Sequence, residues 1–315
     1  MWITPAFPKL IYVLDEHNCL KGGEYDYITK LAVKCSAKRL YPDYISAKKM
    51  RENYEGNVFS PMGCRSFLAP WKDKDGKYKF EGRFNQGVVS INLPQIGIIA
   101  KGDREKFWQL FDERLELCYE ALMCRHERLK GTASDAAPIL WQHGALARMD
   151  ENKTLGEYME EHPTLCTISV GYVGLYETCE ALIGESNTSD NGRLLSKRIL
   201  EYMNYLCNKW KFFDKINYAI YGTPEESLTY KFAMANRKDF GLIDKVTDKD
   251  YVVNSYHVDP REEIDAFKKI EIEGEYLALS SGGAVSYVET PNLQNNLDAV
   301  KQLIQFIYDN IMYAE

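Results

Sequence analysis

Val88-Val89-Ser90-Ile91-Asn92-Leu93 is the most strand-like stretch of the chain, and it ends at Pro94. Its β-branched and apolar residues follow one another almost without interruption, as in a strand that is covered on both faces. Further along, residues 104–129 repeat apolar side chains every three or four positions, which predicts a long amphipathic helix. Together they predict an α/β fold in which helices cover a sheet.

Segments of both kinds alternate along the rest of the chain. Helices are expected at residues 25–39, 171–183, 194–213, 224–235 and 293–313. Strands are expected at residues 217–221, 276–280 and 285–288, the last two on either side of the turn Ser281-Gly282-Gly283. This succession favours a mainly parallel β/α architecture, from which the polar residues 237–263 would form an excursion.

Composition limits the class of protein. The 315 residues are 45% hydrophobic and 27% charged, which is ordinary for a globular protein with a sizeable core. The formal net charge of -7 argues against binding to nucleic acid or to an anionic membrane surface. No apolar run approaches the roughly 18 residues of a membrane span, and the first residues do not read as a signal peptide. A cytoplasmic location is therefore expected, with neither nucleic acid nor membrane as a partner.

The eight cysteines form no CxxC pair and no regular spacing. They are expected to be reduced thiols rather than a disulfide framework, and no metal site is expected. One of them, Cys64, follows a Pro-Met-Gly sequence within Asn57-Val58-Phe59-Ser60-Pro61-Met62-Gly63-Cys64, which predicts a loop. A thiol suits one-electron chemistry because its S–H bond is weak enough to yield a thiyl radical. From these residues alone, however, a buried cysteine in a loop is the simpler interpretation.

Longer motifs surround this loop in a consistent order. Met62-Gly63-Cys64-Arg65-Ser66-Phe67-Leu68 and Gly82-Arg83-Phe84-Asn85-Gln86-Gly87 resemble the anaerobic (class III) ribonucleoside-triphosphate reductases of the glycyl radical enzyme superfamily. Residues 7–12, 34–43, 137–145, 168–177 and 221–228 extend the resemblance over nearly the whole chain.

The resemblance implies a fold and a mechanism. It implies a ten-stranded β/α barrel with a finger loop, here about residues 56–70, reaching into its centre, so that residues 1–315 would be an incomplete catalytic barrel domain. In that family the fingertip cysteine, matched by Cys64, becomes a thiyl radical and takes the 3′ hydrogen of the ribose. The 2′ hydroxyl then leaves as water, which reduces the ribonucleoside triphosphate to a deoxyribonucleoside triphosphate.

Further candidate residues follow from the same motifs. Asn85 matches an active-site position whose amide hydrogen-bonds the sugar hydroxyls, although Asn beside a strand can simply cap a turn. Thr223, before Pro224, predicts a helix start whose free N–H groups, with Ser227, could hold the substrate phosphates. A structural cap explains Thr223 equally well, because Glu225 stands where the family leads us to expect a small residue. His143 could contact the substrate, although a lone His more often packs.

Several parts of the family pattern have no counterpart in these residues. They lack an Arg-Val-Cys-Gly-Tyr-like radical segment, the paired CxxC motifs of the structural zinc, and an N-terminal regulatory segment. No cofactor is therefore expected within the chain, which alone should be inactive. The family implies a glycyl radical generated by a radical-SAM activating protein, a zinc in the C-terminal part, and formate or a thiol system as reductant. The expected partners are a second copy in a complete homodimeric enzyme or a complementary chain.

Two other functions fit the same residues. Formate-lyase and dehydratase relatives among the glycyl radical enzymes also place a cysteine on such a loop, although the Gly82-Arg83-Phe84-Asn85 motif favours the reductase. A non-catalytic half-barrel that binds a partner chain is the other alternative.

Overall fold

A computed structural model describes most of the chain. The described residues are 9–39, 41–62, 65–68, 70–73, 75–80, 82–163, 166–224 and 226–315, with the backbone alone at Glu226. Cys64 and Glu225 therefore lie outside the described residues. The cysteines that are described, at 19, 35, 118, 124, 166, 179 and 207, are free thiols, as expected from their spacing.

The described residues contain eight strands in three sheets. In chain order they are β1 (Ile11–Leu14), β2 (Asp43–Ser46), β3 (Trp71–Lys72), β4 (Tyr78–Lys79), β5 (Phe84–Asn92), β6 (Cys166–Val173), β7 (Asn217–Gly222) and β8 (Tyr313–Ala314). The order β5-β6-β7 makes an all-parallel sheet. In the sheet β1-β2-β8, the first two strands are parallel and β8 is antiparallel to β2, whereas β3 and β4 form a hairpin.

One short segment connects the two larger sheets. On one side, the Gly282 amide donates to the Ile220 carbonyl, 2.6 Å away, and the Gly222 amide donates to the Gly283 carbonyl at 2.9 Å. On the other side, Ser286 forms a parallel bridge with Ala314 in β8. Backbone pairing therefore continues from β5, β6 and β7 through residues 282–286 to β8, β2 and β1.

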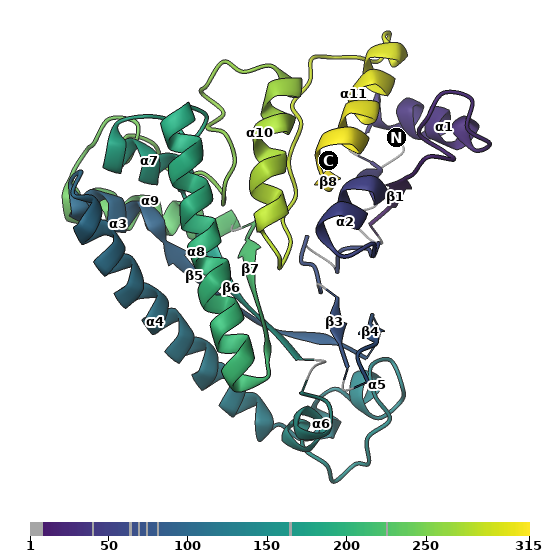
Figure 1. The fold of residues 1–315 in the computed structure, drawn as a ribbon, viewed down its shortest axis with the longest axis vertical. Helices are drawn as coiled ribbons and strands as arrows, with labels where there is room; N and C mark the ends of the chain where they lie inside the picture. The colour runs from purple at the N-terminus through teal and green to yellow at the C-terminus, as the bar shows by residue number, and fades with distance from the viewer. Residues whose placement is uncertain are drawn as a thin grey trace.

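Helices cover the sheets from one side. They are α1 (Asp26–Ser36), α2 (Ala47–Asn53), α3 (Leu93–Ala100), α4 (Arg104–Lys130), η1 (Ser134–Ala136), α5 (Pro138–Trp141), α6 (Leu155–Glu161), α7 (Leu175–Ile183), α8 (Asp190–Asp214), α9 (Glu226–Phe240), α10 (Ala266–Leu279) and α11 (Leu297–Asn310). The long helices α4 and α8 run along β5, β6 and β7, whereas α1, α2 and α11 gather around β1 and β8 (Figure 1). An ion pair between Lys9 and Glu315 brings the two ends of the described chain together.

The mixed α/β class is confirmed, but three expected elements were wrong. Residues 171–183 divide into the end of β6 and helix α7, because Gly174, with φ 79°, turns the chain between two apolar segments. Residues 276–280 belong almost entirely to α10. There, Gly274 is a close-packing position, since a Cβ on it would lie 2.4 Å from the Asn310 carbonyl oxygen. Residues 285–288 contribute only the Ser286 bridge instead of a strand.

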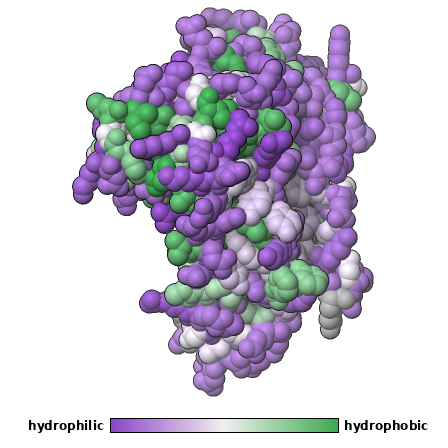
Figure 2. Space-filling view, turned by 60° about the vertical axis from the view of Figure 1, so that its left-hand side comes forward, coloured by the Kyte–Doolittle hydropathy of each residue, from purple (hydrophilic) through white to green (hydrophobic). Residues whose placement is uncertain are grey.

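Some large hydrophobic side chains are exposed at the surface, among them the adjacent Phe212 and Phe213 of α8. The face in Figure 2 is mostly hydrophilic, with hydrophobic residues in separate patches. Among the described residues, no helix is both long enough and apolar enough to cross a membrane.

Candidate active site

The two faces of the β5-β6-β7 sheet differ in chemistry. Asn85 pairs with Thr167, and Val88 pairs with Ser169, so these side chains share one face. Ile168, Val170 and Tyr172 alternate with them and point to the other face. That second face is covered by helices, because Tyr218, the neighbour of Ile168, donates its hydroxyl hydrogen to Met123 in α4 or Asp214 in α8. We call the face of Thr167 and Ser169 the polar face.

Asn85 is held at the beginning of the polar face by a β-bulge. The register of β5 against β6 shifts between Asn85 and Val88, and Gly87 within the bulge has φ 121°. The Gly87 amide donates to Oδ1 of Asn85 at 2.9 Å, which leaves Nδ2 to donate to Oγ of Ser66 at 3.3 Å. Bulges commonly re-aim a side chain beside a functional site, and this one fixes both ends of the Asn85 amide.

Ser66 belongs to the stem of the expected finger loop, which we define as residues 58–62 and 65–68. The Met62 amide donates to the Ser66 carbonyl at 2.7 Å and thereby closes the stem. The Phe67 amide donates to the Gly282 carbonyl at 2.8 Å. Gly283 makes this approach possible, because a Cβ there would lie 2.4 Å from the Arg65 carbonyl oxygen. The Ser281-Gly282-Gly283 turn thus admits the loop stem of the same chain.

Two arginines reinforce the stem. The Arg65 guanidinium lies 4.8 Å from the ring centroid of Tyr287, and its backbone has φ 71°, which non-glycine residues rarely adopt. Arg83 is almost fully buried and donates to the Leu68 carbonyl and to Oγ1 of Thr167. The stem is therefore tied to the polar face through both Asn85 and Arg83.

Cys64 lies outside the described residues, between Met62 and Arg65 of the stem. Its expected position close to Asn85 consequently stays a prediction. What the structure describes is the hydrogen bond of Asn85 to Ser66, two residues further along the chain.

Thr223 lies at the other end of the polar face, directly after β7. Its side chain is 1% exposed, and its hydroxyl has no hydrogen-bond partner among the described residues; the buried Ser169 hydroxyl has none among them either. Gly171 makes room for Thr223, since a Cβ there would lie 2.9 Å from Cγ2 of Thr223. Ser227 follows in the first turn of α9, with an exposed side chain. Two buried hydroxyls without partners are a cost that a polar ligand would remove.

The two ends of the polar face are separated by a length that suits an extended ligand. Asn85 pairs with Thr167, whereas Thr223 lies against Gly171, four residues further along β6. At the usual rise of a strand this is about 13 Å. A nucleotide with an extended phosphate chain is long enough to contact both ends.

His143 is not brought to this face. It follows α5 in a small unit with its own core of Trp141, Leu155, Tyr158, Met159 and Cys166. Trp141 packs edge-to-face on Phe84, at 5.0 Å between centroids, but the His143 side chain itself is exposed. Among the described residues, no hydrogen bond joins its ring to Asn85 or Thr223.

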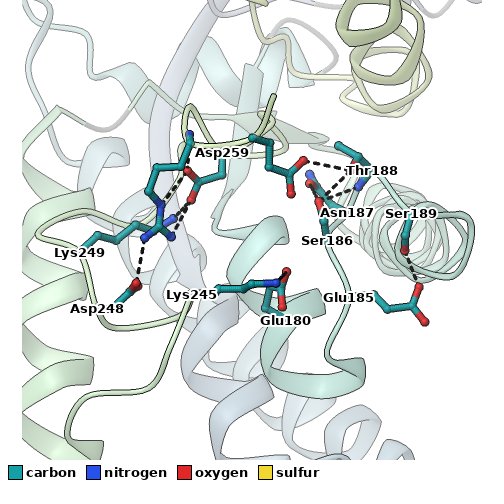
Figure 3. A network of polar contacts seen from close by, with 12 residues as sticks. Glu180, Glu185, Ser186, Asn187, Thr188, Ser189, Lys245, Asp248, Lys249 and Asp259 are labelled. Atoms are coloured by element: carbon teal, nitrogen blue, oxygen red, sulfur yellow. Dashed lines mark hydrogen bonds and ion pairs between the residues drawn. The ribbon is translucent and has the colours of Figure 1, made fainter. Parts of the chain in front are cut away.

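Buried ion pairs fix the long segment that follows α9. Lys249 lies between two fully buried carboxylates, since its Nζ lies 2.7 Å from Oε1 of Glu177. It is also paired with Asp259 (Figure 3). Glu177 in turn accepts from the Val253 amide at 2.8 Å. These contacts hold part of the expected polar excursion, residues 237–263, against α7, which follows the carboxyl end of β6.

The comparison with protein families gives one match over the complete chain. The model of the family "Anaerobic ribonucleoside-triphosphate reductase" matches residues 1–315. This chain belongs to that family. The relative from Escherichia coli is 37% identical over 314 residues, which cover 98% of this chain and 44% of the relative. The relative from Enterobacteria phage T4 is 38% identical over 318 residues, 99% of this chain and 51% of the relative.

Solved structures agree with the family in fold. The anaerobic ribonucleotide reductase from Thermotoga maritima with citrate in the active site has a TM-score of 0.68 at 18% identity, covering 98% of this chain and 50% of that one. The same enzyme in complex with dATP and CTP also gives 0.68, with 98% and 47% covered. The chain therefore spans about half the length of these relatives.

Sequence reasoning missed two residues of the polar face, Thr167 and Ser169. Their signal was present, since the small or polar residues Thr167, Ser169 and Gly171 alternate with Ile168 and Val170. The expected helix from residue 171 cut this alternation off. In the described part of the chain, no group of three or more His, Cys, Asp or Glu side chains is arranged to hold a metal.

Proposed function

We propose that this chain supplies the finger loop and the substrate-binding wall of an anaerobic ribonucleoside-triphosphate reductase. The observation that carries the proposal is the loop stem, which is hydrogen-bonded to Asn85 on the polar face. Membership of the family supports it. In this proposal the continuous pairing from β5 to β1 is part of a ten-stranded barrel, whose remaining strands come from outside the chain.

Cys64 is the proposed site of the chemistry. Its sulfur, as a thiyl radical, takes the 3′ hydrogen of the ribose, and the 2′ hydroxyl leaves as water. The sulfur then returns the hydrogen to C3′. The net reaction consumes two electrons and two protons. Formate supplies both electrons and one proton when it is oxidised to carbon dioxide, and the second proton comes from the solvent; a dithiol supplies both electrons and both protons when it is oxidised to a disulfide.

The residues of this chain bind and orient the substrate. Asn85, already oriented by its bulge, lies at the sugar end of the polar face, where its amide can hold hydroxyl groups. The Thr223 hydroxyl and the first turn of α9, including Ser227, receive the phosphates, because a helix start offers unpaired N–H donors. A direct contact of His143 is not part of this proposal, since its side chain is exposed outside the polar face.

The remaining components come from outside the chain. A glycyl radical, generated by a radical-SAM activating protein, would convert the Cys64 thiol into the thiyl radical. The structural zinc belongs to the C-terminal part of the family pattern. A second copy or a complementary chain completes the enzyme, which we place in the cytoplasm.

Binding of nucleotides to the chain tests the substrate class. Equilibrium dialysis should detect a labelled ribonucleoside triphosphate, and Thr223→Val should weaken binding about tenfold or more, as expected for loss of one hydrogen bond to a charged group. Thr132→Val, in the connection between α4 and α6, is the matched control and should bind normally. Failure of the unchanged chain to bind any ribonucleoside triphosphate would favour another glycyl radical enzyme.

A further inference from the structure

Lys211, near the carboxyl end of α8, is a half-buried cation, and no carboxylate among the described residues pairs with it. Its ammonium lies 4.6 Å from the ring centroid of Trp71, and among the described residues it forms no ion pair. Partial burial is the main reason that the pKa of Lys211 is lowered to about 8; Cys207 opposes this shift, and the charge of Arg83 contributes to it. A desolvated ammonium is costly unless an anion or hydrogen-bond acceptors compensate it.

Arg83 adds a second cation to the same neighbourhood. It is 3% exposed, and its hydrogen bonds go to carbonyls and to Thr167 rather than to any carboxylate in the described chain. Nε of Arg83 and Nε1 of Trp71 are both buried N–H groups without an acceptor. Among the described residues, these two cations and two donors have no negative group beside them.

A cavity of about 530 Å³ opens beside Lys211. Its lining includes Tyr54, Asn204, Cys207 and Asn208. The buried Tyr54 hydroxyl has no hydrogen-bond partner in the described part of the chain. Burial raises the pKa of Cys207 to about 12, so its thiol stays neutral and does not compensate Lys211. The carboxylate on the lining is Glu201, which is exposed and lies about 15 Å from Lys211 along α8, from the helix rise over ten residues.

We propose that this cavity binds a small oxyanion of the phosphate class, with Lys211 as its main ligand. The Tyr54 hydroxyl and the side-chain amide of Asn208 are neutral donors on the same lining. Inorganic phosphate and the phosphate of a small metabolite share this chemistry. The inference does not depend on the proposed reductase reaction.

The position of the cavity gives the bound anion a structural consequence. Tyr54 packs edge-to-face on Phe59, at 4.9 Å between ring centroids, and on Phe67 at 6.4 Å. Both phenylalanines belong to the loop stem. An anion that holds the Tyr54 hydroxyl would therefore support the stem through Phe59 and Phe67, at residues other than the Ser66 that Asn85 contacts.

Sulfate is the probe for the test, because it stays fully ionised between pH 7 and 9. Isothermal titration calorimetry on the full chain should show saturable binding that weakens as the pH rises from 7 to 9, since Lys211 loses its proton near pH 8. Lys211→Met should weaken binding at least about tenfold. Lys211→Arg should bind sulfate from pH 7 to pH 9 without that decline, because Arg keeps its charge.

The control is Lys197→Met, on the same helix, where the lysine is paired with Glu275 at 3.2 Å. It should bind sulfate like the unchanged chain. No saturable sulfate binding, or equal binding by Lys211→Met with circular dichroism intact, would overturn the proposal. If inorganic phosphate displaces bound sulfate and a nucleoside monophosphate does not, the ligand is the free ion. If both displace it, the ligand is the phosphate of a small metabolite.

Discussion

The polar face and the helix-covered face of the β5-β6-β7 sheet come from the same strands but serve different ends. On the helix-covered face, Ile168 and Val170 are fully buried, and α4 contacts the strand that carries them. Each such side chain contributes about 1.5–3 kcal/mol to folding. On the polar face, Thr167 and Ser169 are equally buried but small, and the Ser169 hydroxyl has no partner.

This difference indicates that the two faces of one strand have separate roles, one in stability and one in function. The helix-covered face stabilises the fold through apolar packing, which leaves the polar face free to carry groups that cost stability. Unsatisfied buried hydroxyls and a loop stem with a left-handed Arg65 are such groups. They are expected where a ligand or a reaction compensates their cost.

Ile168→Ala should have the largest effect on stability. It removes a fully buried side chain from the helix-covered face and leaves a cavity, which typically costs about 2–5 kcal/mol. Urea unfolding monitored by circular dichroism measures the loss. A cost below that of Asn85→Ala would contradict the assignment of stability to this face.

Asn85→Ala should cost less, about 1–2 kcal/mol, because two hydrogen bonds of the bulge and the stem are lost. Its main effect should be local. Hydrogen exchange should become faster at Gly87 and at Met62, whereas the amides of β7 should be unchanged. Equal loss of protection in β7 would mean that the bulge supports the whole sheet rather than the stem.

Ser169→Ala should change stability by less than about 1 kcal/mol, in either direction, since it removes a buried hydroxyl without a partner. Ribonucleoside triphosphate binding should weaken, because the polar face loses a donor. The pair Ile168→Ala and Ser169→Ala is thus a test on adjacent residues. A large unfolding cost for Ser169→Ala would remove the distinction between the faces.

The smallest effect concerns His126 in α4, whose Nδ1 lies 2.7 Å from Oε1 of Gln86 in the bulge. Burial lowers the pKa of His126, and the charge of Lys130 adds to this effect. The folded state then binds fewer protons than the unfolded one. Its contribution to stability is complete above pH 6.5, the ordinary value, and is lost as the pH falls through the lower folded pKa. Unfolding of the unchanged chain between pH 7.5 and 5.5 should show this decline, and His126→Gln should lack it.

Much of the fold could be predicted from the sequence because its signals are local. The apolar run before Pro94 and the regular spacing in residues 104–129 correspond to β5 and α4. The division of residues 171–183 depends on how Gly174 turns the chain, and α10 depends on Gly274 packing against α11. Such tertiary contacts leave no mark on local periodicity.

The candidate site likewise contains residues that local motifs predict and contacts that depend on the tertiary structure. Asn85 and Thr223 could be named from motifs, and both lie on the polar face. The hydrogen bond of Asn85 to Ser66 could not be predicted, because it joins strand β5 to the loop stem, and their approach depends on the bulge at Gly87 and on Gly283. His143 belongs to a motif of the family as well, but its exposed side chain lies outside the polar face.

Replacement of Cys64 by Ser in the complete reductase tests the central claim most directly. The hydroxyl O–H bond is too strong to relay the radical, whereas serine keeps most of the shape of the side chain. Anaerobic turnover of a labelled ribonucleoside triphosphate should therefore be abolished, while electron paramagnetic resonance still detects the glycyl radical after activation. Substantial deoxynucleotide formation by Cys64→Ser would contradict the account.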